Sequence, residues 1–357
     1  MLTTSRPIPL EDVLTQVLES KIPNTRDCRL VRRVLGWDGQ RGCGLKDAGD
    51  EFGITRERAR QIYDQAIRQI GSADVGTTLD EALALVNRTS GRAAADIEDE
   101  LLRRRFTRYQ FAIPALVKTA QVFARVPEFT LEEAAGKLFV VAAAGVIQSI
   151  IKAARQASTQ HGVQNISGLC SAISGIQRHG NHRLLIRQVL NAGGDVRWLD
   201  AGEETFWLAS VPRNPMVRCL KKVLCYASPV TLSDLHRAIG RLPPKHRATL
   251  TRPQLTRFCE QLPFCRVANG CVERVGPLPA GSLISDAERL VCRILQRNGN
   301  DLPVERLRSL SALAGVGRPN FWRIALHSPL IFRRAPGSYG VIAASPHPLG
   351  AVKGRTA

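Results

Sequence analysis

Long apolar runs are absent from this chain of 357 residues. The most apolar stretch, Leu138 to Ile151, is interrupted by Gly145, Gln148 and Ser149. A membrane-spanning helix needs about 18 apolar residues, and this stretch is shorter. It predicts a strand followed by a buried helix. The N-terminal segment also lacks the apolar core of a secretory signal peptide, so we expect a cytoplasmic protein without membrane partners.

Aromatic residues are scarce, at 5% of the chain, and the cysteines lack the close pairs of a structural zinc site. There are nine cysteines, an odd number, and the most regular group is Cys259, Cys265 and Cys271, which are six residues apart. In a reducing compartment such cysteines are most simply buried thiols. We therefore predict no metal site.

The motifs of common catalytic sites are missing as well. The chain has no P-loop, no glycine-rich dinucleotide turn, no paired carboxylates in an apolar setting, and no nucleophile placed with histidine and aspartate. Its seven histidines are dispersed. The sequence predicts a protein that is not an enzyme and needs no cofactor.

Basic residues, in contrast, are abundant. Fifty Lys and Arg against 31 Asp and Glu give a formal net charge of +19, which spreads a positive potential over the surface. Nucleic acid is the expected partner, because basic side chains bind phosphates by releasing condensed counterions. An anionic membrane is the alternative, but the chain shows no basic amphipathic helix with aromatic residues on its apolar face.

One segment, LKDAGDEFGITRERARQIYDQAIRQI from Leu45 to Ile70, predicts a helix-turn-helix. The apolar or small residues recur at helical spacing on either side of a break at Gly53, Ile54 and Thr55. Gly53 gives the backbone freedom for a tight turn, and Thr55 can cap the second helix. The inner faces are expected at Leu45, Ala48, Gly49 and Phe52, and at Ala59, Ile62, Ala66 and Ile70.

The second helix of this motif carries the side chains that a DNA-binding helix needs in the major groove. Arginine pairs with guanine, glutamine with adenine, and glutamate accepts from cytosine. The alternative is a charged helix face that is merely solvated. The predicted DNA-binding residues are Thr55, Arg56, Glu57, Arg58, Arg60, Gln61 and Arg68.

The string EFGITRERARQI, followed by AIRQI, resembles region 4.2 of sigma-70 family transcription factors. The resemblance extends over residues 8–72, since 27–36 resembles the preceding region 4.1 helix. It implies that Arg56, Glu57, Arg60 and Gln61 recognise the upstream promoter element. Two positions depart from the family pattern.

Gly44 replaces the usual Thr or Ser cap, and Ala59 replaces a larger aliphatic residue. The remainder of the chain shows no further sigma motif, in particular no aromatic-rich segment of the type that melts promoter DNA. A complete sigma factor is therefore not expected.

After this N-terminal domain, 1–75, a faint repeat of about 60 to 70 residues is visible. Each copy is predicted to hold two or three helices followed by a hairpin, which is the order of a winged helix, with turns at Gly136, Gly202, Gly270 and Gly337. The expected fold class is mainly α with small β-hairpins. The predicted modules are 76–143, 144–212, 213–278 and 279–345, followed by a flexible basic tail, 346–357.

The last helix before each hairpin carries basic residues that could contact phosphates. Winged helices also serve as protein-docking platforms, and in that case these residues would only keep the surface soluble. The sequence leaves both interpretations open. The residues are Lys118, Arg183, Arg187, Arg252, Arg257, Arg318 and Arg323.

Together these features predict a sequence-specific duplex DNA-binding protein that acts in transcription. A second hypothesis is an interaction scaffold that docks on RNA polymerase or a multiprotein complex, since region 4 of the resembled family also binds the polymerase flap. A third is RNA binding through the basic surface. The sequence does not specify an oligomeric state.

Overall fold

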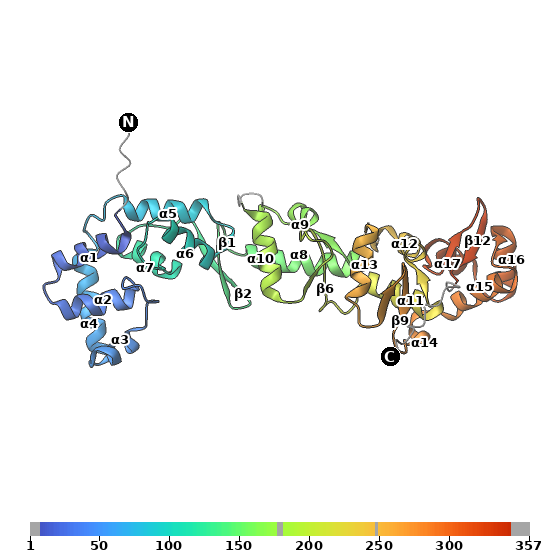
Figure 1. The fold of residues 1–357 in the computed structure, drawn as a ribbon, viewed down its shortest axis with the longest axis horizontal. Helices are drawn as coiled ribbons and strands as arrows, with labels where there is room; N and C mark the ends of the chain where they lie inside the picture. The colour runs from blue at the N-terminus through green and yellow to red at the C-terminus, as the bar shows by residue number, and fades with distance from the viewer. Residues whose placement is uncertain (1–7, 177–180, 247–248, 344–357) are drawn as a thin grey trace, which may run out of the picture. The chain divides into compact units, whose positions relative to one another are not determined.

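The computed structural model describes residues 8–176, 181–246 and 249–343. These residues form seventeen α-helices and twelve short strands, which confirms the expected mainly helical fold with small hairpins (Figure 1). None of the described helices is both long and apolar enough to cross a membrane. The predicted basic tail, 346–357, lies outside the described residues.

The first helices follow local sequence signals. Helix α2 begins after Asn24, whose side chain accepts hydrogen bonds from the backbone amides of Arg26 and Asp27, and it ends at Gly36, which has a φ of 75°. Helix α1 buries Leu10 and three further residues on one face. The four helices of this part are α1 (Leu10–Lys21), α2 (Thr25–Leu35), α3 (Leu45–Phe52) and α4 (Arg56–Ile70).

The order helix, strand, helix, helix, strand, strand then occurs four times. The first copy is α5 (Thr78–Arg88), β1 (Arg92–Ala93), α6 (Ala94–Arg103), α7 (Ile113–Val122), β2 (Thr130–Ala134) and β3 (Lys137–Val141). The second is α8 (Val146–His161), β4 (Gln164–Asn165), α9 (Ile166–Ala172), α10 (His182–Gly193), β5 (Val196–Trp198) and β6 (Thr205–Leu208). One copy therefore lies in each of the ranges 76–143 and 144–212.

The other two copies lie in the ranges 213–278 and 279–345. The third is α11 (Pro215–Tyr226), β7 (Val230–Thr231), α12 (Leu232–Gly240), the 3₁₀ turn η2 (Pro244–His246), α13 (Arg252–Glu260), β8 (Cys265–Ala268) and β9 (Cys271–Arg274). The fourth follows α14 (Ala280–Leu283) and is α15 (Asp286–Arg297), β10 (Leu302–Pro303), α16 (Val304–Leu313), α17 (Arg318–His327), β11 (Ile331–Arg333) and β12 (Ser338–Val341). The predicted domain boundaries themselves stay a prediction.

Each copy has one three-stranded antiparallel sheet with its last strand in the centre. The strand orders are β1-β3-β2, β4-β6-β5, β7-β9-β8 and β10-β12-β11. In the first sheet, Val140 of β3 is opposite both Arg92 of β1 and Leu131 of β2. The sequence did not predict the first strand of each copy, because two residues are too short to show alternation.

Three of the four predicted hairpin glycines have the left-handed backbone that a tight turn requires. The φ values are 77° at Gly136, 72° at Gly270 and 82° at Gly337. Gly202 also lies in its predicted turn, between β5 and β6, but the left-handed residue there is the next one, Glu203, with a φ of 52°. Each hairpin forms around its predicted turn.

The chain divides into two compact units. Unit 1 comprises residues 1–151 and 173–194, and unit 2 comprises residues 152–172 and 195–357. The division passes through α8, whose first residues belong to unit 1 and whose remainder belongs to unit 2.

Each unit has a large hydrophobic core. The core of unit 1 is continuous from Leu10 in α1 to Val140 in β3, so the helix-turn-helix segment and the first copy share one interior. The core of unit 2 extends from Val163 to Ile342 and includes Phe258 of α13. Burial on this scale is the main favourable contribution to folding.

Candidate nucleic-acid interface

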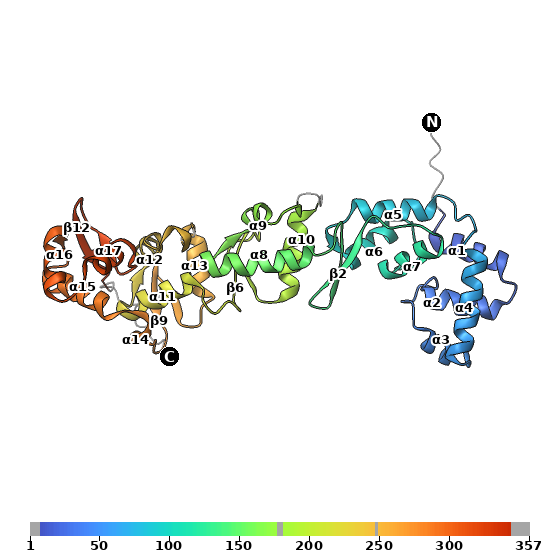
Figure 2. The same ribbon diagram turned by 180° about the vertical axis from the view of Figure 1, so that it is seen from behind.

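Helices α3 and α4 pack against each other and lie side by side in both views (Figures 1 and 2). Gly53 lies in the turn between them. Gly53 has a φ of 64°, which favours glycine. Gly49 is buried, and a Cβ atom at this position would lie 2.8 Å from the carbonyl oxygen of Ile54. The close approach of the two helices therefore depends on a glycine in α3 as well as on the glycine of the turn.

The start of α4 and its inner face lie where the sequence predicts them. The Thr55 hydroxyl accepts a hydrogen bond of 3.2 Å from the Arg58 amide, which satisfies one amide of the first turn. Ala59, Ala66 and Ile70 are buried. These contacts fix the helix against the core and leave its other face to solvent.

That outer face carries the predicted DNA-binding side chains. All of them are exposed, namely Thr55, Arg56, Glu57, Arg58, Arg60, Gln61 and Arg68. They occupy the cap, the first two turns and the last turn of α4, so the first turns present several hydrogen-bonding groups side by side.

Arg60 is the most constrained of these side chains. Its guanidinium pairs with Glu57 at 2.7 Å and with Asp64 at 2.9 Å, one turn away on either side. The hydrogen bond from Arg60 lowers the pKa of Glu57 below its ordinary value, and the same pairing raises the pKa of Arg60. Glu57 and Arg60 are therefore both charged at neutral pH and already oriented on the helix surface.

The remaining side chains on this face are more available. Arg58 donates to the Gln61 side chain at 3.3 Å. The guanidinium groups of Arg56 and Arg68 make no hydrogen bond or ion pair with the described residues. Arg56, in the first turn, is therefore the side chain most ready to take a new partner.

Sequence reasoning missed the basic residues of α2 that contact the turn. The Arg26 guanidinium donates to the Phe52 carbonyl at the end of α3. The Arg29 guanidinium lies 5.9 Å from the centre of the Phe52 ring, within the range of a cation–π contact. Arg33 pairs with Glu51 at 2.9 Å. These contacts join segments about 20 residues apart, so no local pattern indicates them.

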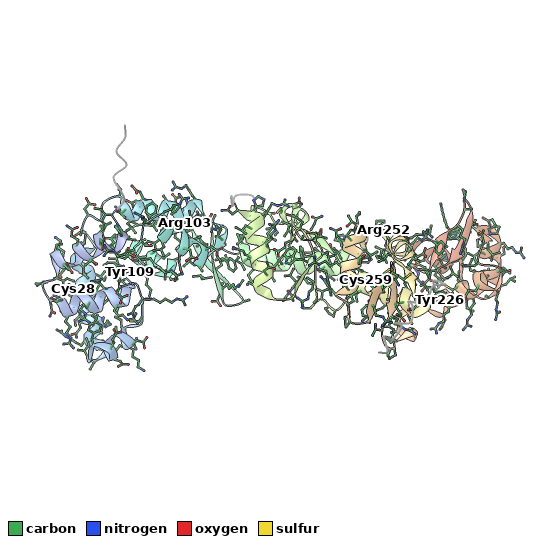
Figure 3. All side chains as sticks on the ribbon, in the orientation of Figure 1. Cys28, Arg103, Tyr109, Tyr226, Arg252 and Cys259 are labelled. Carbon is green, nitrogen blue, oxygen red and sulfur yellow. The ribbon has the colours of Figure 1, made fainter. Side chains whose placement is uncertain are left out.

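The predicted phosphate-contacting residues lie on the third helix of each copy. Six of the seven are exposed and Arg187 is half-buried. Arg252, labelled in Figure 3 at the start of α13, donates to the Ser233 hydroxyl at 2.5 Å. The helices and residues are α7 with Lys118, α10 with Arg183 and Arg187, α13 with Arg252 and Arg257, and α17 with Arg318 and Arg323.

The inner face of α7 packs against α2 and the segment that follows it. The indole Nε1 of Trp37 donates to the Thr119 hydroxyl of α7 at 2.8 Å, and both side chains are fully buried. The Trp37 ring also stacks on Phe123 at 6.4 Å between ring centres. This contact joins the segment after α2 to the first copy within unit 1.

The third helices of the later copies make equivalent contacts with the copy before them. In α10, the Gln188 side chain donates to Asp96 at 2.5 Å and accepts from the Ala93 amide at 3.0 Å. In α17, the Ala325 carbonyl accepts from the Arg241 guanidinium, which lies beyond α12. One face of each helix is thus covered by protein.

Helix α13 shows this arrangement most completely. The Gln261 side chain, just after the helix, accepts from the Trp207 indole at 2.8 Å and donates to the Trp198 carbonyl at 2.9 Å. Gln254 donates to the Thr205 hydroxyl at 2.9 Å and to the Asp200 carboxylate at 3.3 Å. The hairpin of the second copy is therefore bonded to the third helix of the third.

The positive charge is not spread evenly along the chain. Residues 1–100 contain 14 Lys and Arg against 17 Asp and Glu, whereas residues 101–357 contain 36 against 14. The most basic copy is 213–278, with 12 against 3. Long-range attraction to a polyanion therefore arises mainly from the later copies, and not from the helix-turn-helix segment.

The cysteines show no arrangement suited to metal binding. Within the described ranges, no three His, Cys, Asp or Glu side chains converge. Burial raises the pKa of Cys259, and it raises that of Cys265 to about 12, so both are neutral thiols at neutral pH.

No protein-family model matches the chain, and a search of curated proteins finds no significant similarity.

Proposed function

We propose that this protein binds duplex DNA sequence-specifically through α4 and acts in transcription in the cytoplasm. The observation that supports this most directly is the exposed row of Arg56, Arg58 and Gln61 on a helix whose other face is fixed in the core of unit 1. A rigid element that presents several donors at helical spacing suits the base edges of the major groove. The resemblance to sigma-70 region 4 supports the same function.

The geometry suggests different roles for the exposed side chains of α4. Arg56 takes a base or phosphate partner without giving up a protein contact. Arg60 exchanges its exposed pairings with Glu57 and Asp64 for a DNA partner, which costs little because exposed ion pairs contribute little. Gln61 offers an amide that can pair with adenine.

We further propose that each of the four copies is a winged helix and that their basic residues add phosphate contacts. The order of elements and the hairpin after the third helix support this assignment. The net positive charge of residues 101–357 supports a role in non-specific attraction to DNA.

A second candidate function is an interaction scaffold that docks on RNA polymerase. It is favoured by the third helices, because in each copy one face contacts the preceding part of the chain. These contacts keep that face of each third helix out of a DNA groove, and a protein partner would dock on the exposed face instead. Co-purification of RNA polymerase subunits with the tagged chain after nuclease treatment supports the scaffold, and their absence contradicts it.

The DNA-binding proposal is tested by measuring affinity for a duplex selected from a random library. Arg56→Ala is expected to weaken binding to the selected duplex by about 1–3 kcal/mol and to leave binding to scrambled DNA nearly unchanged. The matched control is Arg88→Ala, which removes an exposed arginine from α5 in the same unit. Equal losses in the two variants would show that Arg56 acts only through its charge.

A further inference from the structure

A basic pocket lies in unit 2 around the beginning of α11. Its volume is about 580 Å³, which is within the range of pockets that hold small organic ligands. The segment before α11 and its first turns form one side, and α14, which packs beside α11 in both ribbon views, contributes Ser282 and Leu283 (Figures 1 and 2). Thr159 of α8, His327 of α17 and residues after α12 and α17 complete the lining.

The lining is strongly cationic. Arg213, Arg218, Lys221 and Lys222 all contribute, and none of the described lining residues is Asp or Glu. Lys222 is neutralised by an ion pair of 2.5 Å with Glu288, outside the lining, and the Lys221 ammonium lies 5.1 Å from the centre of the Phe264 ring. These two lysines already have partners.

The two arginines of the lining, in contrast, have no such partners. The guanidinium groups of Arg213 and Arg218 are exposed and make no hydrogen bond or ion pair with the described residues. Each has five N–H donors in a planar arrangement that matches phosphate oxygens. The pocket therefore combines two unpaired guanidinium groups with a concave surface that holds no opposing carboxylate.

The position relative to α11 adds to the attraction for an anion. Asn214 caps this helix of 12 residues, and its side chain accepts from the amides of Met216 and Val217 at 2.9 and 3.2 Å and donates to the Gly162 carbonyl at 2.7 Å. These contacts hold the helix start in place. The positive end of the helix dipole therefore lies near Arg213, before the helix, and Arg218, in its first turns, so that all three attract an anion.

Part of the remaining wall is apolar and suits a flat organic group. It includes Pro215, Leu242, Leu283 and Pro329. A bare anion would not use this surface, whereas the base of a nucleotide would bury against it. The size and the two kinds of lining favour a ligand with both phosphates and a ring system.

We propose that this pocket binds a nucleotide, with Arg213 and Arg218 holding its phosphates and the apolar wall packing against its base. The site is separate from α4 and belongs to the other unit. It is therefore independent of the DNA-binding proposal.

The test is titration calorimetry of the full chain with ATP, with inorganic pyrophosphate and with adenosine as probes. ATP is expected to bind best, because it uses both the guanidinium groups and the apolar wall. The double variant Arg213→Ala/Arg218→Ala is expected to lose ATP affinity by on the order of tenfold for each guanidinium removed. Arg213→Lys/Arg218→Lys keeps the charge and should retain part of the affinity, since lysine cannot bind bidentately.

The control variant is Arg293→Ala/Arg306→Ala, which removes the same charge from exposed positions of unit 2. It should bind ATP as the wild type does. Equal losses in both double variants would overturn the proposal in favour of general charge attraction. An absence of ATP binding would also overturn the proposal. If DNA binding were then weaker only in Arg213→Ala/Arg218→Ala, the pocket would be identified as a contact for the DNA backbone.

Discussion

Gly49 in α3 gives the sharpest test of how the helix-turn-helix is built. An alanine Cβ at this position would lie 2.8 Å from the Ile54 carbonyl oxygen and 3.4 Å from the Arg56 amide nitrogen. The first distance is shorter than an ordinary contact, and both atoms belong to the backbone, so neither can rotate away. The substitution must push the start of α4 outward.

Two opposing effects determine how much Gly49→Ala changes the free energy of unfolding. Alanine is favoured over glycine in a helix by about 1 kcal/mol, whereas overpacking of a close contact costs about 1–3 kcal/mol. The net expectation is a loss of about 0–2 kcal/mol in the free energy of unfolding of unit 1. Affinity for a selected DNA duplex should fall as well, because the exposed residues of α4 move with the helix.

Hydrogen exchange of the amides in residues 45–70, together with the affinity for the selected duplex, measures both effects. The matched control is Gly240→Ala at the end of α12, where an added Cβ would have no atom within 4 Å and the φ angle is not left-handed. This control should be neutral or slightly stabilising. If Gly49→Ala behaves like Gly240→Ala and DNA affinity is unchanged, the close approach of α3 and α4 is not what positions the binding face.

Three further substitutions probe the contacts within the units. Trp37→Phe removes the indole donor to Thr119 and should destabilise unit 1 by about 1–3 kcal/mol in chemical denaturation; an unchanged midpoint would mean that the buried hydrogen bond contributes nothing. Gln261→Ala leaves the Trp207 indole unpaired and should destabilise unit 2 by a similar amount, whereas an unaltered unfolding curve would contradict a structural role for this contact. Burial raises the pKa of the Asp200 carboxyl, but hydrogen bonds from the backbone amides of Glu204 and Thr205 and from the side chains of Thr205 and Gln254 outweigh it and lower the pKa below its ordinary value. The carboxylate therefore stabilises the fold above the ordinary pKa of aspartate, and this contribution is lost as the pH falls through the folded pKa. Asp200→Asn should flatten the acid side of the stability profile, and an identical profile would refute the assignment.

The local features of the fold could be predicted from the sequence. Gly53 and Thr55 mark the turn and the cap of α4 because backbone freedom and side-chain capping are properties of single residues. The four hairpins could be predicted because glycine turns separate runs of β-branched and aromatic side chains. Strand β1, with only Arg92 and Ala93, carries no such pattern.

The long-range features could not be predicted. The hydrogen bond between Trp37 and Thr119 joins residues 82 positions apart, and no periodicity relates them. The packing of α13 on the preceding hairpin depends on Gln261, an ordinary polar residue in the sequence. The ion pair of Arg60 with Glu57 is local, but it depends on the direction of the two side chains. The sequence alone does not specify that direction, and it favoured a contact between Arg60 and a base.

Recognition of a DNA sequence by α4 can be tested directly. The most direct test is selection of binding sites from a random duplex library by the full chain, followed by affinity measurements on the selected and scrambled duplexes at several salt concentrations. The account predicts a defined motif that Arg56→Ala binds less well, with a steep salt dependence that the variant largely retains. Recovery of no motif, with equal affinity for all duplexes, would contradict sequence recognition by α4 and would leave the basic surface as a non-specific anchor.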